Sequence, residues 1–158
     1  MKKIAIAFVA LLALFACSED DNDYSGGNNQ PANVQFTVLK DGELSGEEVE
    51  SGYYVIKTAE QWADFKGMVN SVHDAPDEFE GISVNFNVSD VLAVVDEQHN
   101  SGGFDIAITS VSRADNTATV KVVRSGDGNA ATVLTQPYHV ISIPKSNNEF
   151  AFDEDAPQ

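Results

Sequence analysis

Apolar and polar residues alternate in several short segments of this chain, and a period of two residues is typical of half-buried β-strands. The segments with this alternation are Val34–Leu39, Tyr53–Lys57, Ile82–Val88 and three stretches that begin at Phe104, Thr117 and Tyr138. Val91–Val95 is instead apolar at every position. A fully apolar strand is buried on both faces, so this segment is predicted to lie in the middle of a sheet.

Glycines, prolines and short polar runs separate the predicted strands. Turns are expected at Lys40–Gly42, Gly102–Gly103 and Arg113–Asn116, and a longer loop at Ser125–Ala131. Pro137 and Pro144 are predicted to mark strand ends, because proline has no N–H to donate to a ladder. Phe150–Phe152 is expected to add a last short segment to the core.

One helix is predicted between the second and third of these strands. Thr58–Gln61 fits a capping box, in which the threonine hydroxyl and the glutamine side chain satisfy backbone N–H groups at the helix start. An apolar stripe with helical spacing follows at Trp62, Phe65, Val69 and Val72. The fold class expected is therefore α+β, with a mainly antiparallel sheet of seven or eight strands, a sandwich or a partial barrel, and one amphipathic helix.

Two segments of this predicted sheet carry a resemblance to a known family. The Ser-Gly-Gly-Phe-Asp-Ile turn at residues 101–106 and the Gln-Pro-Tyr-His-Val-Ile-Ser-Ile-Pro-Lys run at residues 136–145 resemble the C-terminal domain of the protease complex subunit PrcB family. The resemblance extends over Val91–Lys145, about a third of the chain. It implies a lipoprotein that associates with and supports a secreted protease, and it brings no catalytic residues.

The amino terminus has the pattern of a bacterial lipoprotein. A short basic head is followed by an apolar run over Ile4–Phe15 that is too short to span a bilayer comfortably, as in an export signal. The run ends in Leu-Phe-Ala-Cys, which resembles a lipobox, so Cys17 is predicted to carry diacylglycerol and an acyl chain such as palmitate. A buried cysteine after an ordinary signal peptide is the alternative. Cys17 is the only cysteine, so no internal disulfide is possible.

An acidic, almost entirely polar segment follows this cysteine, and such composition is typical of a flexible tether. The segment resembles the export signal of bacteroidete surface lipoproteins, which predicts an outer-membrane anchor and a surface-exposed domain. The expected organisation is a signal peptide at 1–16, a tether at 17–32, one globular domain at 33–152 with the PrcB-like part at 91–145, and a tail at 153–158.

Charge narrows the choice of partners. The chain has 9 basic and 25 acidic residues, a formal charge of −16, and cleavage before Cys17 removes two lysines and makes it −18. So negative a protein is a poor partner for nucleic acid, which is itself polyanionic.

The sequence contains few candidates for a catalytic or metal-binding site. The three histidines are scattered, no His-Glu-x-x-His motif occurs, and no Ser-Gly pair forms a nucleophile elbow, so we expect neither a cofactor nor a metal. The remaining candidate is a weak binding cluster of Asp96, Glu97 and His99 beside the glycine turn, where the carboxylates could raise the pKa of the imidazole. His139 is a second weak candidate on a strand.

Three function classes fit the sequence. The first is a non-catalytic, membrane-anchored accessory subunit that binds a protein partner, such as a secreted protease, through a sheet edge or the loop after Ser125. The second is a small-ligand or glycan binder that would use aromatic side chains for stacking: Tyr53, Tyr54, Trp62 and Tyr138. The third is an unrecognised hydrolase built from residues far apart in sequence.

Overall fold

The computed structural model describes residues 30–71 and 77–155, and it contains one helix and eight strands within them. The predicted signal peptide, most of the predicted tether, the lipidation of Cys17 and the helical role of Val72 fall outside these residues. The elements are β1 Ala32–Asn33, β2 Thr37–Ser45, β3 Gly52–Ile56, α1 Ala59–Asn70, β4 Ser89–Val95, β5 Asp105–Ala114, β6 Thr117–Ser125, β7 Thr135–Pro144 and β8 Glu149–Asp155.

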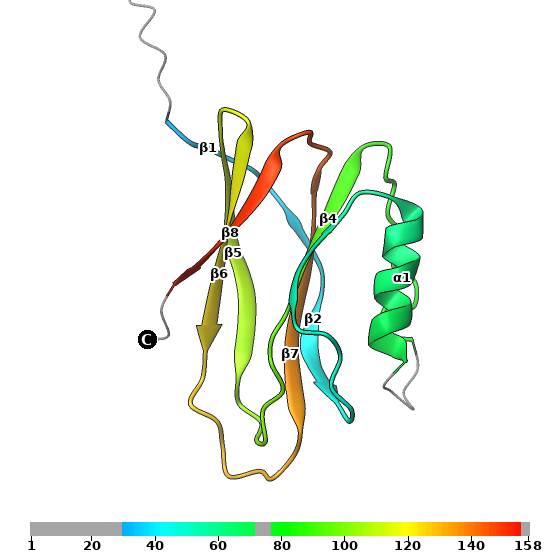
Figure 1. Ribbon diagram of the computed structural model, residues 1–158, viewed down its shortest axis with the longest axis vertical. Helices are drawn as coiled ribbons and strands as arrows, with labels where there is room; N and C mark the ends of the chain where they lie inside the picture. The colour runs from blue at the N-terminus through cyan, green and yellow to red at the C-terminus, as the bar shows by residue number, and fades with distance from the viewer. Residues whose placement is uncertain (1–29, 72–76, 156–158) are drawn as a thin grey trace, which may run out of the picture.

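Two four-stranded sheets and the helix form three layers (Figure 1). One sheet has the order β2-β7-β4-β3 and is antiparallel throughout, and the other has the order β1-β5-β6-β8. Among the strands of residues 30–71 and 77–155, only the pair of β6 and β8 is parallel. The predicted α+β class with a mainly antiparallel sandwich is confirmed, and the sheets do not close into a barrel.

The sheet with β4 forms the central layer, with α1 on one face and the second sheet on the other (Figure 1). Val91, Ala93 and Val95 pack into the core beside the helix, whereas Leu92 and Val94 pack into the core between the sheets. This double burial explains why β4 is apolar at every position and confirms that it lies inside the sheet.

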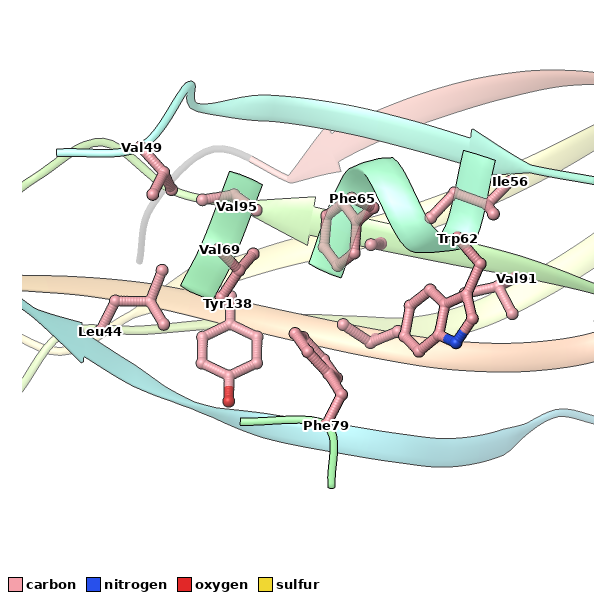
Figure 2. Close-up of a cluster of buried hydrophobic side chains, with 12 residues drawn as sticks. Leu44, Val49, Ile56, Trp62, Phe65, Val69, Phe79, Val91, Val95 and Tyr138 are labelled. Atoms are coloured by element: carbon pink, nitrogen blue, oxygen red, sulfur yellow. The ribbon is translucent and has the colours of Figure 1, made fainter. Parts of the chain in front are cut away.

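The helix begins as the sequence predicts. The hydroxyl of Thr58 accepts a hydrogen bond from the backbone N–H of Gln61 at 3.2 Å, and the Gln61 side chain accepts one from the N–H of Lys57 at 2.8 Å. Trp62, Phe65 and Val69 are buried against the central sheet. Figure 2 shows these side chains together with Phe79 and Tyr138 in one apolar cluster. Within the described residues, no helix is long and apolar enough to cross a membrane.

Three local predictions are wrong. Lys40–Gly42 is not a turn, because β2 runs through it and pairs with β7 as far as Ser45. Pro144 ends β7 as predicted, but Pro137 lies inside that strand and pairs with Glu43. The predicted strand at Ile82–Val88 is an irregular segment that ends in a turn closed by the Asn85 carbonyl.

The alternation of apolar and polar residues at 82–88 nevertheless corresponds to alternating burial. Ile82, Val84 and Phe86 pack on the helix-side core, whereas the intervening residues are exposed. An extended chain that crosses a core surface without a ladder partner has the same period of two as a strand. The Val34–Leu39 prediction differs for a similar reason: Val34 and Phe36 pack on the inter-sheet core between β1 and β2.

Candidate functional site

The end of β4 carries the first predicted site residue, Asp96, which is buried. The Arg124 side chain donates from Nε to Oδ1 of Asp96 at 2.7 Å, and Nε2 of His99 lies 3.2 Å from Oδ2. Arg124 also contacts the carboxylate of Glu154 on β8. The aspartate thus joins β4, β6 and the loop before β5, and each of its oxygens has a protein partner.

The other two residues of the predicted cluster are placed differently. His99 is half-buried and stacks on Phe104 with ring centroids 3.9 Å apart, and its backbone forms two hydrogen bonds with Thr135. Glu97 is exposed and lines a cleft of about 300 Å³ that Asp96 and Arg124 also line, but it makes no hydrogen bond within the network of these two side chains. The structure therefore brings Asp96 and His99 together with Arg124, and Arg124 is a member that sequence reasoning missed.

The network of Asp96, Arg124 and His99, called the clamp below, connects elements within the protein. This aspartate is buried, and its two oxygens face an arginine and an imidazole, so it is poorly placed to meet a ligand from solvent. In the part of the chain that the structure describes, no group of three His, Cys, Asp or Glu side chains is placed to hold a metal ion. Asp96 and His99, but not Glu97, thus organise the loops at this end of the sandwich.

Gln136 on β7 fixes the neighbouring loop and was not singled out in the sequence. Its buried side chain accepts a hydrogen bond from the N–H of Val49 at 2.9 Å and donates to two carbonyls, those of Val49 at 2.9 Å and Asp96 at 2.8 Å. The amide thereby attaches the loop that precedes β3 to the end of β4. Its neighbour Pro137 contributes through its carbonyl, which accepts from the N–H of Asp96.

The glycine turn and the loop after β6 pack closely on each other. Gly126 has φ +94°, and a Cβ atom at this position would lie 1.9 Å from the carbonyl oxygen of Gly103. The Asn129 side chain packs on Gly102 and Gly103. A Cβ atom added at either glycine would be in close contact with it. The hydroxyl of Thr135 at the end of the loop donates to the carbonyl of Ser101 at 2.8 Å. Both ends of the observed loop between β6 and β7 are therefore held by the turn.

Between these two anchor points, the loop exposes apolar side chains. Every residue from Ala130 to Leu134 is exposed, with Val133 at 42% and Leu134 at 49% of their full accessible surface. None of the five belongs to a helix or strand. A sequence signal did exist, because Ala-Ala-Thr-Val-Leu is an apolar run that follows a glycine-rich loop without alternation. The predicted loop ended at Ala131 and so missed the two largest of these side chains.

His139 faces the second sheet, not a binding surface. Its Nδ1 accepts a hydrogen bond from the backbone N–H of Ile108 at 3.2 Å, so the neutral ring carries its proton on Nε2. Burial lowers the pKa of His139 below its ordinary value, although the nearby carboxylates of Asp41 and Asp105 act in the opposite direction. The neutral ring joins β7 of one sheet to β5 of the other.

Protonation of His139 is therefore expected to destabilise the fold. The folded-state pKa lies below the unfolded value near 6.5, so the stabilisation is complete above pH 6.5 and is lost as the pH falls below it. One proton accounts for at most about 1.4 kcal/mol per pH unit. Urea unfolding at pH 7.5 and 5.5 measures this loss. In His139→Asn, which keeps an acceptor but does not titrate, the loss should be smaller, and an equal loss in both proteins would contradict the assignment.

The aromatic residues considered for ligand stacking differ in exposure, and only Tyr53 is exposed. Trp62 and Tyr138 are buried, and Tyr53 covers Phe152 of β8 with ring centroids 4.6 Å apart. Tyr54 is half-buried, and its ring packs edge-on against Phe65. The four side chains therefore do not form a common stacking surface.

Comparison with known proteins gives one match. No curated protein and no solved structure matches the chain. The family model described as PrcB C-terminal matches residues 91–144, which run from β4 to the end of β7 and include the clamp, the glycine turn and the exposed loop. The predicted resemblance is thus confirmed over this segment: residues 91–144 are similar to the PrcB C-terminal domain family.

Proposed function

We propose that this protein is a non-catalytic, lipid-anchored accessory subunit that binds a secreted protease through the exposed segment Ala130–Leu134. The observation that carries the proposal is the solvent exposure of Val133 and Leu134 on a loop whose two ends are fixed. Adjacent exposed aliphatic side chains form a small contiguous apolar surface that a partner can cover. A loop with fixed ends loses little conformational entropy on binding, which favours such a role.

The family match supports a role in a protease complex in general terms. The matched residues 91–144 contain the whole exposed segment and both of its anchor points. A mostly apolar segment without secondary structure also fits the substrate cleft of a protease, because such clefts bind chains without secondary structure and hold their side chains in pockets. The protease is thus the partner class that the family and the loop geometry both favour.

Membrane attachment through Cys17 and display on the outer surface complete the proposal. From Cys17 to the first described residue, Gln30, the chain can extend at most about 45 Å. A tether of that length would allow the domain to reach a partner beside the membrane without dissociating from it. The acidic composition of residues 18–23 supports this role, because it disfavours both a packed core and adhesion to anionic lipid.

Charged substitutions in the exposed segment are expected to abolish partner capture. In Val133→Asp/Leu134→Asp, desolvation of two carboxylates would oppose burial of the loop, so recovery of the crosslinked partner should fall at least tenfold. The measurement is co-purification of the full-length protein from its native membranes after mild crosslinking, with identification of the recovered proteins by mass spectrometry.

The matched control is Val88→Asp, because Val88 is a 61% exposed valine outside the segment. This variant should recover the partner as the native protein does, and both variants should keep the native unfolding midpoint. Equal recovery by the double variant and the control would remove the loop from the proposal. Recovery of lipid alone by the native protein would overturn the accessory-subunit function.

A further inference from the structure

A second surface, unrelated to the exposed loop, lies between strand β3 and helix α1. The two elements border a groove of about 530 Å³. Tyr54 and Ile56 line its strand side, and Phe65 and Met68 line its helix side. Ile56 and Phe65 are buried, whereas Tyr54 and Met68 are half-buried, so the groove has an apolar floor that remains open to solvent.

The strand beside this groove is an uncovered sheet edge. β3 is the last strand in the order β2-β7-β4-β3, and within the described residues it pairs only with β4. Every second residue of an edge strand directs its N–H and C=O groups away from the sheet, where another chain can pair with them. The groove and the edge therefore offer pockets for side chains and a ladder for a backbone at the same place.

The two longer edges, β2 and β8, carry charges or a register shift that hinder such pairing, whereas β3, an edge of five residues, carries neither. β2 has Lys40, Asp41 and Glu43 along its length and a register shift before Lys40. β8 has four acidic residues in seven. β3 reads Gly-Tyr-Tyr-Val-Ile, with neither a charge nor a proline. Natural sheets protect their edges with charges, prolines and bulges, so an unprotected edge beside an apolar groove indicates a site of strand addition.

The charged residues that line the groove indicate which kind of chain it would bind. Glu50 and Asp64 line it, and no lysine or arginine does. Both residues are exposed and are therefore available to an incoming cation. Chains that add to an edge place alternate side chains on one face, so an apolar residue at every second position would suit the floor of the groove.

We infer that the groove between β3 and α1 binds an extended segment of a protein partner, about five residues long, with apolar side chains at alternate positions and lysine or arginine near its ends. The segment would add to β3 as a fifth strand of the central sheet. This inference goes beyond the proposed function, because it involves none of the residues of the exposed loop and holds whether or not the partner is a protease.

Two other occupants fit less well. The chain's own segment at 18–23 contains Glu19, Asp20, Asp21 and Asp23, so it would bring negative charge to a negative groove. A second copy paired through β3 would place the Glu50 and Asp64 carboxylates of both copies close together. Charge complementarity therefore favours a basic segment from another protein.

Peptide binding to the full-length protein in detergent tests the inference by fluorescence anisotropy. The probe is a labelled, end-capped peptide, Lys-Thr-Val-Thr-Val-Thr-Lys, in which the valines and both lysines lie on one face of an extended strand. We expect saturable binding, and at least tenfold weaker binding by two relatives of the probe. One has glutamate in place of both lysines. The other is N-methylated at its five central amides, so it keeps the side chains and charges but cannot donate to a ladder.

Variants locate the bound peptide. Glu50→Gln/Asp64→Asn should weaken binding of the probe at least tenfold without altering the fold, and Met68→Arg should do so by filling the groove. Glu43→Gln, on the opposite edge of the sheet, is the matched control and should bind as the native protein does. Val133→Asp/Leu134→Asp should also bind normally, which keeps this test separate from that of the exposed loop.

Four results would overturn the inference. The first is absence of saturable binding up to 1 mM probe, and the second is equal binding of the N-methylated peptide. The third is a dimer on size exclusion that Met68→Arg dissociates, which would assign the groove to a second copy. The fourth is a tenfold gain in probe affinity in Asp20→Asn/Asp21→Asn/Asp23→Asn, which would assign it to the chain's own acidic segment.

Discussion

Replacement of Gln136 by leucine is expected to lower the free energy of unfolding by about 3 kcal/mol or more. Leucine has a similar volume but cannot bond the N–H and C=O of Val49 or the C=O of Asp96, all of which bond the Gln136 side chain. A buried backbone group left without a partner costs about 1–3 kcal/mol, so three such losses exceed the effect of most single substitutions. Urea denaturation followed by tryptophan fluorescence provides the measurement, because Trp62 is buried in the adjacent core.

Gln98→Leu is the matched control for this prediction. Gln98 also donates from its side chain to a backbone carbonyl of the same loop, that of Gly46 at 2.8 Å, but it is only half-buried. Water can replace this bond, so the loss should stay below about 1 kcal/mol. If the two variants were equally stable, the buried amide would not be what holds the loop to β4.

Loss of the Gln136 side chain is also expected to affect the groove between β3 and α1. The loop that this side chain fixes leads directly into β3, and it carries Glu50 at the mouth of the groove. In Gln136→Leu the loop would lose its attachment to β4 and β7. We therefore expect weaker binding of the basic probe peptide by this variant even under conditions where it remains folded.

The hydrophobic pattern of the sequence was sufficient to predict the elements that are buried on one whole face or on both faces. The apolar stripe of Trp62, Phe65 and Val69 predicts α1, and the unbroken apolar run of β4 predicts a strand covered on both faces. In both cases the apolar positions in the sequence are the positions that face the core. Where a chain crosses the core without pairing, as at Ile82, Val84 and Phe86, the same reasoning predicts a strand that does not form.

The candidate site was less accessible to sequence reasoning, because its contacts join distant residues. Asp96 and His99 are three residues apart and were recognised together, but the partner that occupies Asp96 is Arg124, which lies 28 residues away on another strand. Which strands are neighbours also depends on the packing of two sheets. Nothing in the sequence of β8, for example, indicates that it pairs with β6 in the parallel direction.

The groove shows a further limit of sequence patterns. Tyr53 and Tyr54 were considered as stacking residues for a ligand, but adjacent residues of a strand face opposite sides of the sheet. Tyr53 accordingly packs on Phe152 of the second sheet, whereas Tyr54 packs on Phe65 of the helix. The surface that results is an edge with an apolar groove, and its recognition required the strand order.

Gly126→Ala is expected to destabilise the protein by about 2–4 kcal/mol and to release the exposed loop. The new Cβ would lie 1.9 Å from the carbonyl oxygen of Gly103, far inside van der Waals contact, and the φ of +94° is itself unfavourable for alanine. The backbone must therefore shift on both sides of the contact. The free energy of unfolding from urea denaturation measures the cost, and partner recovery after crosslinking measures the effect on the loop.

Gly81→Ala separates the two contributions to this cost. Gly81 has a similar positive φ of +78°, but a Cβ there would meet no atom within 4 Å. Its replacement should cost only the conformational part, about 1–2 kcal/mol, and should leave partner recovery unchanged. The difference between the two variants is then the contribution of the contact between the loop and the glycine turn. A difference near zero would show that this contact does not hold the loop, and the exposed segment would lose the fixed geometry on which the proposed binding depends.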